Sequence, residues 1–188
     1  SAYHALVVGQ EHGRAFAPVC GRIPGFECKR DVTPTISKAC YAFARMTPER
    51  EELLNRRLTE AISQQPELGR LKEFLLQLGG EFLVAPPSPD QDVPMLLEQG
   101  FLMSGPVTLK IMQSSSCHRN VASVWIRKEF GIVGIATGYA LSDDGLWRQH
   151  TWGVLRNGVL ETTQERLKYF GLLFQGKRAD FFAESNAG

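Results

Sequence analysis

Residues 132–163 read IVGIATGYALSDDGLWRQHTWGVLRNGVLETT, and this stretch decides the fold. It contains three apolar runs separated by two turn sequences, Asp143-Asp144-Gly145 and Asn157-Gly158. The runs cover residues 132–141, 146–155 and 159–163. Asn-Gly between apolar runs is a strong hairpin signal, because both residues tolerate positive φ. The stretch therefore predicts an antiparallel meander of three strands.

Upstream of the meander, the sequence predicts a strand, a turn and a helix in succession. Residues 107–112 fit a strand, 113–116 a polar turn and 117–128 an amphipathic helix. Cys117 would then begin the helix. The unpaired N–H groups of a first helical turn stabilise a thiolate, which is the reactive form of cysteine. This position favours a nucleophilic thiol.

A histidine and an acid follow Cys117 on the predicted strands. With Asn157-Gly158 as the two-residue turn, Val154 faces Glu161, and even spacing places His150 on the same sheet face as Glu161. Glu165 is the alternative acid, because the same register places it across from His150. In such a set the imidazole takes the thiol proton and later protonates the leaving amine, while the acid orients the ring. The order of these residues thus fits acyl transfer.

Four further residues are candidates for the cleft around the thiol. Gln113, together with the first N–H groups of the helix, is placed to hold an oxyanion, and Ser116 precedes the helix as its cap. Trp147 and Trp152 flank the histidine, and they fit either the core or one wall of the cleft. His118 is expected on the helix surface, because neighbours in sequence diverge around a helix.

Cys117, His150-Thr151-Trp152 and Glu161-Thr162-Thr163 together resemble the transglutaminase-like branch of the papain-like cysteine enzymes. In that family a helix-capping Cys precedes an H-x-W strand and a D-x-T strand, and Glu161 stands where the family has Asp. The resemblance covers about residues 107–175. It implies an α+β fold with a papain-like or transglutaminase-like core, in which a helix packs on an antiparallel sheet. It also implies Cys117 as nucleophile, His150 as general base and acid, and Glu161 as the orienting acid.

The first half of the chain is expected to be mostly helical. Thr47-Pro48-Glu49 fits a helix start, with a capping side chain, a proline at the first helical position and an acid at the positive end of the dipole. This helix should end near Gln64. A second helix should cover residues 67–78 and stop at Gly79. Together they predict a helical hairpin.

The chain reads as a single domain, residues 1–188, in three parts. Residues 1–85 form the helical part, 86–99 a Pro-rich surface connection that could act as a flap, and 100–188 the catalytic-type core. Within the first part, a β-like run lies at 6–8 and a possible helix at 37–45.

The amino-acid composition limits the classes of partner that we expect. The 21 basic and 20 acidic residues nearly cancel, which gives no reason to expect a nucleic acid or an anionic membrane as partner. No apolar run approaches the ~18 to 20 residues of a membrane span. Reduced thiols are favoured for the irregularly spaced cysteines, with a Cys20–Cys28 disulfide as the alternative. No metal and no cofactor are expected, because Asp143-Asp144-Gly145 lacks the calcium-loop alternation and no phosphate loop is present.

Two functions are compatible with these features. The first is a thiol enzyme acting on peptide or glutamine-type amides of a protein or peptide substrate, as a protease, deamidase or transamidase. The second is a noncatalytic interaction module on the same fold, with an inert thiol and with the helical hairpin as its partner surface. Either would act in the cytoplasm or as an exported effector, and the sequence leaves the oligomeric state open.

Overall fold

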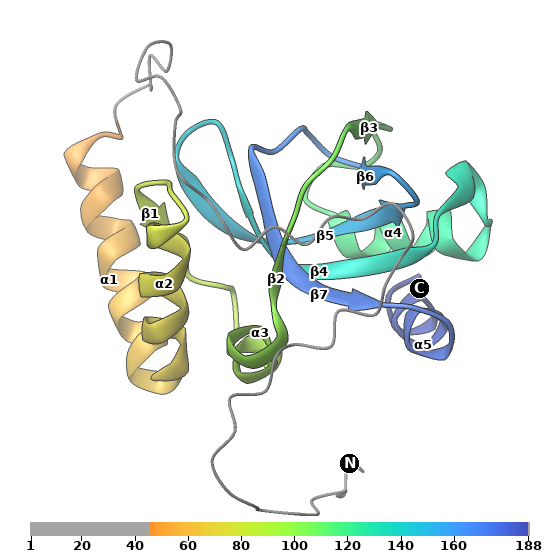
Figure 1. Ribbon diagram of the computed structural model, residues 1–188. Coiled ribbons are helices and arrows are strands. Elements are labelled where there is room, and N and C mark those ends of the chain that lie inside the picture. Colours follow the sequence, from red (N-terminus) through yellow and green to blue (C-terminus); the bar gives the residue numbers. More distant parts are fainter. Residues whose placement is uncertain (1–45, 188) are drawn as a thin grey trace, which may run out of the picture.

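The computed structural model describes residues 46–187, which form a mixed α+β structure with five α-helices around a curled sheet (Figure 1). The β-like run at 6–8, the helix at 37–45 and the cysteines Cys20, Cys28 and Cys40 lie outside this range. Within it, no helix is long and apolar enough to cross a membrane.

The helices and strands alternate irregularly along the chain. The helices are α1 (Pro48–Gln64), α2 (Glu67–Gln77), α3 (Val93–Gln99), α4 (Cys117–Ile126) and α5 (Lys177–Asn186), with a 3₁₀ turn at Glu129–Gly131. The strands are β1 (Phe82–Leu83), β2 (Phe101–Met103), β3 (Val107–Leu109), β4 (Gly134–Leu141), β5 (Leu146–Leu155), β6 (Gly158–Glu161) and β7 (Lys168–Phe174).

The sheet has the strand order β2-β7-β4-β5-β6-β3, and β1 pairs with the beginning of β5. Strands β4, β5 and β6 form the antiparallel meander predicted from the sequence. Strand β7 returns to the far side of β4, while β1 and β3 pair parallel to β5 and β6. The sheet is therefore mixed: the expected antiparallel sheet extends from β2 to β6, and β1 and β3 are added to it by parallel pairing.

The hairpin between β5 and β6 has a different register from the expected one. Leu155 pairs with Gly158 and Val154 with Val159, so the two-residue turn is Arg156-Asn157. This strand position requires a glycine, because a Cβ at residue 158 would meet the backbone oxygen of residue 106 at 2.1 Å. The register shifts by two residues, which leaves each side chain on its predicted face because the strand period is two.

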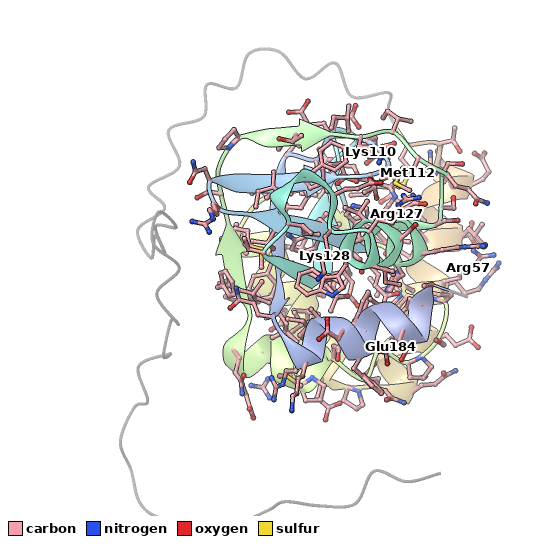
Figure 2. The ribbon with its side chains drawn as sticks, turned by 90° about the vertical axis from the view of Figure 1, so that its right-hand side faces the viewer. Arg57, Lys110, Met112, Arg127, Lys128 and Glu184 are labelled. Carbon is pink, nitrogen blue, oxygen red and sulfur yellow. The ribbon has the colours of Figure 1, made fainter. Side chains whose placement is uncertain are left out.

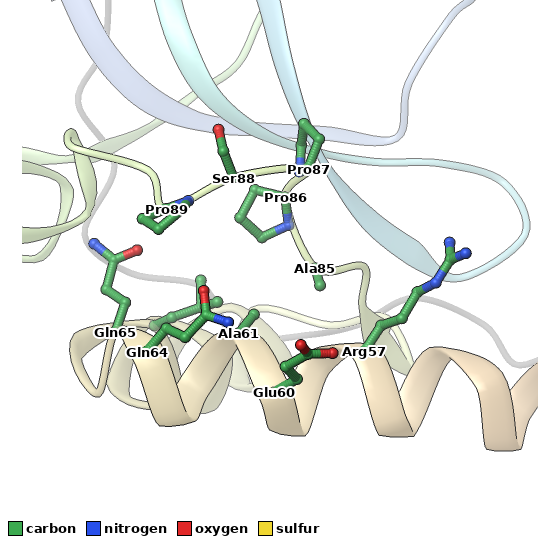
Figure 3. A pocket seen from close by; sticks show the side chains of 11 residues that line it. Arg57, Glu60, Ala61, Gln64, Gln65, Ala85, Pro86, Pro87, Ser88 and Pro89 are labelled. Carbon is green, nitrogen blue, oxygen red and sulfur yellow. The ribbon is translucent and has the colours of Figure 1, made fainter.

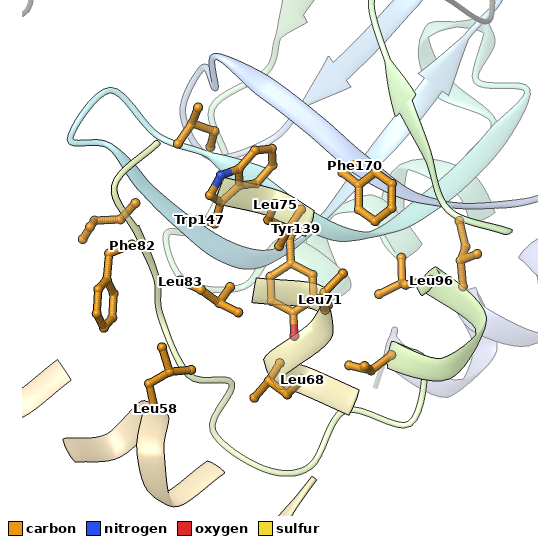
Figure 4. Packing of buried hydrophobic residues seen from close by; sticks show 14 residues of the cluster. Leu58, Leu68, Leu71, Leu75, Phe82, Leu83, Leu96, Tyr139, Trp147 and Phe170 are labelled. Carbon is orange, nitrogen blue, oxygen red and sulfur yellow. The ribbon is translucent and has the colours of Figure 1, made fainter. Parts of the chain in front are cut away.

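The helical hairpin predicted near the start of the described chain is present. The Thr47 hydroxyl accepts a hydrogen bond from the Arg50 amide at 3.3 Å and caps α1, which ends at Gln64 as expected. Its partner α2 ends at Gln77, one residue earlier than predicted. Buried leucines of these helices pack against Tyr139, Trp147 and Phe170 of the sheet (Figure 4).

Residues 86–99 are not simply a connection, because Val93–Gln99 form α3. Asp92 and a proline begin this helix, and buried Val93 and Leu96 join it to the core beside α2. The Pro-rich part before α3 is fixed at its end, where the Gln65 amide bonds to both the carbonyl and the N–H of Asp90.

At the other end of the sheet, α4 packs against β4, β5 and α5. Val121 and Ala122 of α4, Ile135 of β4, and Ala179 and Ala183 of α5 form a buried cluster there. This packing fixes the helix that begins at Cys117.

Candidate active site

Cys117 is the first residue of α4, as predicted. The helix begins with a hydrogen bond from the Asn120 amide to the Ser116 carbonyl at 2.8 Å. Ser116 occupies the cap position, but its hydroxyl makes no cap hydrogen bond and instead donates weakly to the Ser114 carbonyl at 3.4 Å. The first-turn amides of α4 thus keep their capacity to donate to a negatively charged group.

The Cys117 thiol is half-buried and interacts with two histidines. Its Sγ atom lies 3.4 Å from Nδ1 of His118. Burial raises the pKa of the thiol, but hydrogen bonding to His118 and, to a smaller degree, to His150 outweighs burial, and the charges of both rings add to the effect. The resulting pKa of Cys117 is about 5. The thiol is therefore a thiolate at neutral pH, which is the nucleophilic form.

The expectation that His118 is a surface residue beyond the site is wrong. His118 is half-buried, its Nδ1 faces the sulfur, and its ring stacks on Phe182 of α5 with centroids 5.8 Å apart. The packing of α5 against α4 holds the ring there. The sequence carried no signal for this, because the contact depends on a helix sixty residues later.

His150 and Glu161 form a buried pair. Nε2 of His150 lies 2.8 Å from Oε2 of Glu161, and the two residues are 3% and 0% exposed. Burial lowers the pKa of His150, yet its bonds to Cys117 and Glu161 outweigh burial and raise it. Burial likewise raises the pKa of Glu161, and the His150 bond and the backbone amides overcome this and lower it. Both shifts favour an imidazolium beside a carboxylate.

The observed hairpin register explains how these two side chains meet. Continued by one step, the β5–β6 pairing places Glu161 across from Trp152, so His150 is its diagonal neighbour on the same face. The expected register would have separated them by one more diagonal step. A glutamate side chain bridges the observed distance without unusual twist.

Glu161 is held by more than the histidine. Its Oε1 accepts from the amides of Thr162 and Thr163, at 2.8 and 2.9 Å, and from the Thr163 hydroxyl at 2.9 Å. Its Oε2 also accepts from the Tyr169 hydroxyl at 3.3 Å. Sequence reasoning missed Tyr169, because β7 lies three strands away from β6 along the sheet and was not predicted. These bonds orient the carboxylate toward the ring.

Glu165, the alternative acid, does not take part in this arrangement. It is exposed in the loop that follows β6, where the strand pairing it would need has already ended. The structure brings Glu161 to His150 instead.

Trp147 does not line a cleft. It is 0% exposed in the cluster under α1 and α2, and its Nε1 donates to the Gly79 carbonyl at 2.7 Å. Trp152 is also fully buried, so it is a core residue, but its ring stacks against His150 with centroids 6.1 Å apart. Trp152 thus supports the imidazole from behind rather than forming an open wall.

Gln113 is exposed, and its backbone is the part that the structure fixes. The buried Asn120 side chain donates to the Gln113 carbonyl at 2.7 Å. This bond ties the turn before Cys117 to the second turn of α4. Asn120 was not singled out from the sequence, because a polar residue in a helix carries no sign of the turn it contacts.

The first part of the Pro-rich segment lies beside α1. Ala85–Pro89 lies along α1 and forms with it a hollow lined by Arg57, Glu60, Ala61 and Gln64 (Figure 3). Cys117, His150 and Glu161 are absent from that lining. That the segment acts as a flap stays a prediction.

Within residues 46–187, no group of three or more His, Cys, Asp and Glu side chains is arranged to bind a metal ion. Comparison of the chain with protein-family models, curated proteins and solved structures finds no match. Function must accordingly be argued from the chemistry of Cys117, His150 and Glu161.

Proposed function

We propose that the protein is a thiol enzyme that transfers acyl groups from amides through a Cys117–His150–Glu161 triad, on a core of the papain-like or transglutaminase-like type. The observation that carries the proposal is the shared imidazole. His150 bonds to a buried carboxylate that is held by four other donors, and the same ring helps to lower the pKa of the Cys117 thiol to about 5.

The atoms support a two-stage reaction. The Cys117 thiolate attacks the amide carbonyl carbon and forms an S–C bond, and the tetrahedral oxyanion takes hydrogen bonds from the first-turn amides of α4. The His150 imidazolium then gives its proton to the leaving amine as the C–N bond breaks. Water or a second amine, deprotonated by His150, attacks the thioester and releases Cys117.

The identity of the second nucleophile separates three activities. Water acting on a peptide bond gives a protease, water acting on a glutamine side chain gives a deamidase, and a lysine amine gives a transamidase. Because Glu161 bonds to Nε2 of His150, Nδ1 is the nitrogen available to the thiol in each case. The three share their first step, so one test of that step covers them all.

The first test is the alkylation rate of each cysteine by iodoacetamide near neutral pH, followed by peptide mass spectrometry. Cys117 should react much faster than Cys20, Cys28 and Cys40, because its thiolate fraction is larger. Equal and slow alkylation of all four would instead favour the noncatalytic interaction module. Cys117→Ala and Cys117→Ser should keep the fold and abolish any acyl transfer to water or to a fluorescent amine from glutamine-containing peptides.

A further inference from the structure

Two arginine side chains meet at the end of the sheet where β4 ends and β7 begins. Nη1 of Arg148 donates to Oγ of Ser142 at 2.8 Å, and Nη1 of Arg166 donates to the same oxygen. Ser142 directly follows β4 and is buried. One hydroxyl oxygen therefore holds two guanidinium groups together.

The charge of this cluster is only partly compensated. Asp144 binds Arg148 through both carboxylate oxygens, at 2.8 and 2.6 Å. Arg166 forms no ion pair with any side chain in residues 46–187, and its Nε is buried without a hydrogen-bond partner there. Without an ion pair in this range, Arg166 keeps its positive charge. A buried donor without a partner is rare in native proteins, so the free Nε indicates that this guanidinium still has hydrogen-bonding capacity.

The cluster adjoins the triad. Arg148 lies two residues before His150 on β5, so both project from the same face. The Arg166 amide donates to the Tyr169 hydroxyl at 3.3 Å, and that hydroxyl donates to Glu161. Burial lowers the pKa of Arg166, while the charges of Glu161 and Cys117 oppose this effect. The guanidinium is thus within electrostatic range of the sulfur.

We propose that Arg148 and Arg166, joined through Ser142, form an anion subsite beside Cys117, and that the amide substrate carries a carboxylate that binds there. This inference rests on the proposed thiol chemistry and specifies its substrate class: peptides with an acidic side chain or a free α-carboxylate next to the reacting amide. A guanidinium matches a carboxylate in charge and in planar geometry, which makes arginine suited to this recognition.

A second role for Arg166 would be to balance the buried charge of Glu161. The two roles have different effects on the reactivity of Cys117. A balancing cation changes the thiolate fraction, which affects every reagent equally, whereas an anion subsite favours negatively charged reagents over neutral ones. Iodoacetate and iodoacetamide have nearly the same size and leaving group and differ in charge. In both reactions the thiolate forms an S–C bond and iodide leaves, so the ratio of their rates cancels the thiolate fraction.

The experiment measures this ratio at Cys117 by peptide mass spectrometry in the full-length wild type, Arg166→Gln, Arg166→Lys and a control. The control is Arg127→Gln, which removes an equal charge. Arg127 follows the ten-residue helix α4 and forms an ion pair with Glu129 at 2.9 Å. Figure 2 labels it on the same side of the molecule as Lys110 and Lys128. Arg127 lies about 15 Å along the helix from Cys117, beyond the Debye length of about 8 Å at physiological salt.

The wild-type ratio of iodoacetate to iodoacetamide rates should exceed that of glutathione. It should fall about threefold to tenfold in Arg166→Gln, recover partly in Arg166→Lys and stay unchanged in Arg127→Gln. Far-UV circular dichroism verifies that each variant is folded. A ratio in Arg166→Gln equal to that of the wild type overturns the anion subsite while leaving the thiol enzyme intact. Slow alkylation of Cys117 by both reagents in the wild type overturns the thiol chemistry and, with it, this inference.

Discussion

The Cys117 thiol lies beside His118, and both His118 and His150 lower its pKa. Within residues 46–187, only His150 of these two rings pairs with a carboxylate. His118 Nδ1 lies 3.4 Å from the sulfur, and its ring stacks on Phe182. His150 is bound by Glu161, which stabilises the imidazolium and fixes which nitrogen carries the proton. We therefore propose that His150 transfers the proton and that His118 positions the thiolate.

Substitution of each histidine by glutamine should separate these roles. His150→Gln should lower kcat about 10²- to 10⁴-fold, because general acid–base catalysis contributes that much. His118→Gln should lower kcat far less, because the proton pathway remains. Steady-state kinetics on the same glutamine peptide would decide, and a larger loss in His118→Gln than in His150→Gln would reverse the assignment.

The pH dependence of alkylation provides a second prediction at this scale. Because the pKa of Cys117 is about 5, its iodoacetamide rate should stay high from pH 7 down to about pH 6 and halve near pH 5. His118→Gln should move this midpoint upward, since its hydrogen bond is the largest of the effects that lower the pKa. Unfolded protein, whose thiols titrate near the ordinary value, serves as the reference. A wild-type midpoint above pH 8 would contradict the arrangement.

Glu161→Gln should affect both activity and acid stability. The amide would present a donor to Nε2 of His150 and reverse the ring tautomer, so kcat should fall about 10²- to 10⁴-fold. The pKa of Glu161 is lower in the folded state than its ordinary value of 4.5, so its ionisation stabilises the fold above that value. This stability is lost as the pH falls through the lowered pKa.

Urea unfolding at about pH 6 and about pH 3 would measure that contribution. The wild type should lose more free energy of unfolding between these values than Glu161→Gln does, because the variant has no carboxylate to protonate at this position. Glu165→Gln is the matched control. Because that side chain is exposed, its substitution should not change the loss of unfolding free energy at acid pH. If the wild type and Glu161→Gln lose the same free energy of unfolding between these pH values, the buried pair contributes nothing to stability against acid.

Sequence reasoning could place Cys117 at a helix start and His150 and Glu161 on one face of the sheet, because these signals are local. It could not find Tyr169, Asn120 or Arg166, whose partners lie in other elements. It misjudged His118 for the same reason, since α5 holds that ring.

At the scale of elements, the β5–β6 hairpin shows that a local turn sequence can predict a hairpin without predicting its register. Asn-Gly correctly predicted a hairpin between β5 and β6, but Gly158 is needed in the strand where the chain before β3 passes close to it. A neighbouring segment decided the register, and the sequence of the hairpin alone contains no information about that segment. The period of two preserved the face of His150 and Glu161 all the same.

The turn before α4 depends on one side chain, which gives a prediction at the same scale. Asn120→Ala removes the bond to the Gln113 carbonyl, so it should lower the free energy of unfolding by about 0.5 to 1.5 kcal/mol, the net contribution of a hydrogen bond whose acceptor can turn to water. Cys117 alkylation should also slow, because the turn would no longer fix the helix start. Urea unfolding and alkylation rates measure the two effects.

Ser116→Ala is the matched control for Asn120→Ala. Ser116 is adjacent to Cys117 at the cap position but makes no cap hydrogen bond, so its loss should cost less than about 0.5 kcal/mol. If both variants lose the same stability, the Asn120 bond is not what holds the turn.

At the scale of the whole molecule, the helical first half and the sheet share one hydrogen-bonded framework. β1 pairs with β5, and the amide of Val84 donates to the Trp147 carbonyl at 2.9 Å. Periodicity predicted α1 and α2 well, because each has an apolar face of helical spacing. It could not place them on the sheet, since the two-residue strand β1 that joins them to β5 is too short to produce a pattern.

This framework predicts that α1, α2 and the sheet unfold together. Leu71 is fully buried in α2 and belongs to the same cluster as Tyr139 and Trp147 of the sheet, so Leu71→Ala should lower the free energy of unfolding by about 2 to 5 kcal/mol. Leu109→Ala, at an exposed position on β3, should change it by less than about 0.5 kcal/mol. Urea unfolding of the full chain should give coincident transitions by circular dichroism and tryptophan fluorescence in both variants. If helical signal were lost in Leu71→Ala before the fluorescence changed, the helices would be a separate unit, and the triad would stand on the sheet and α4 alone.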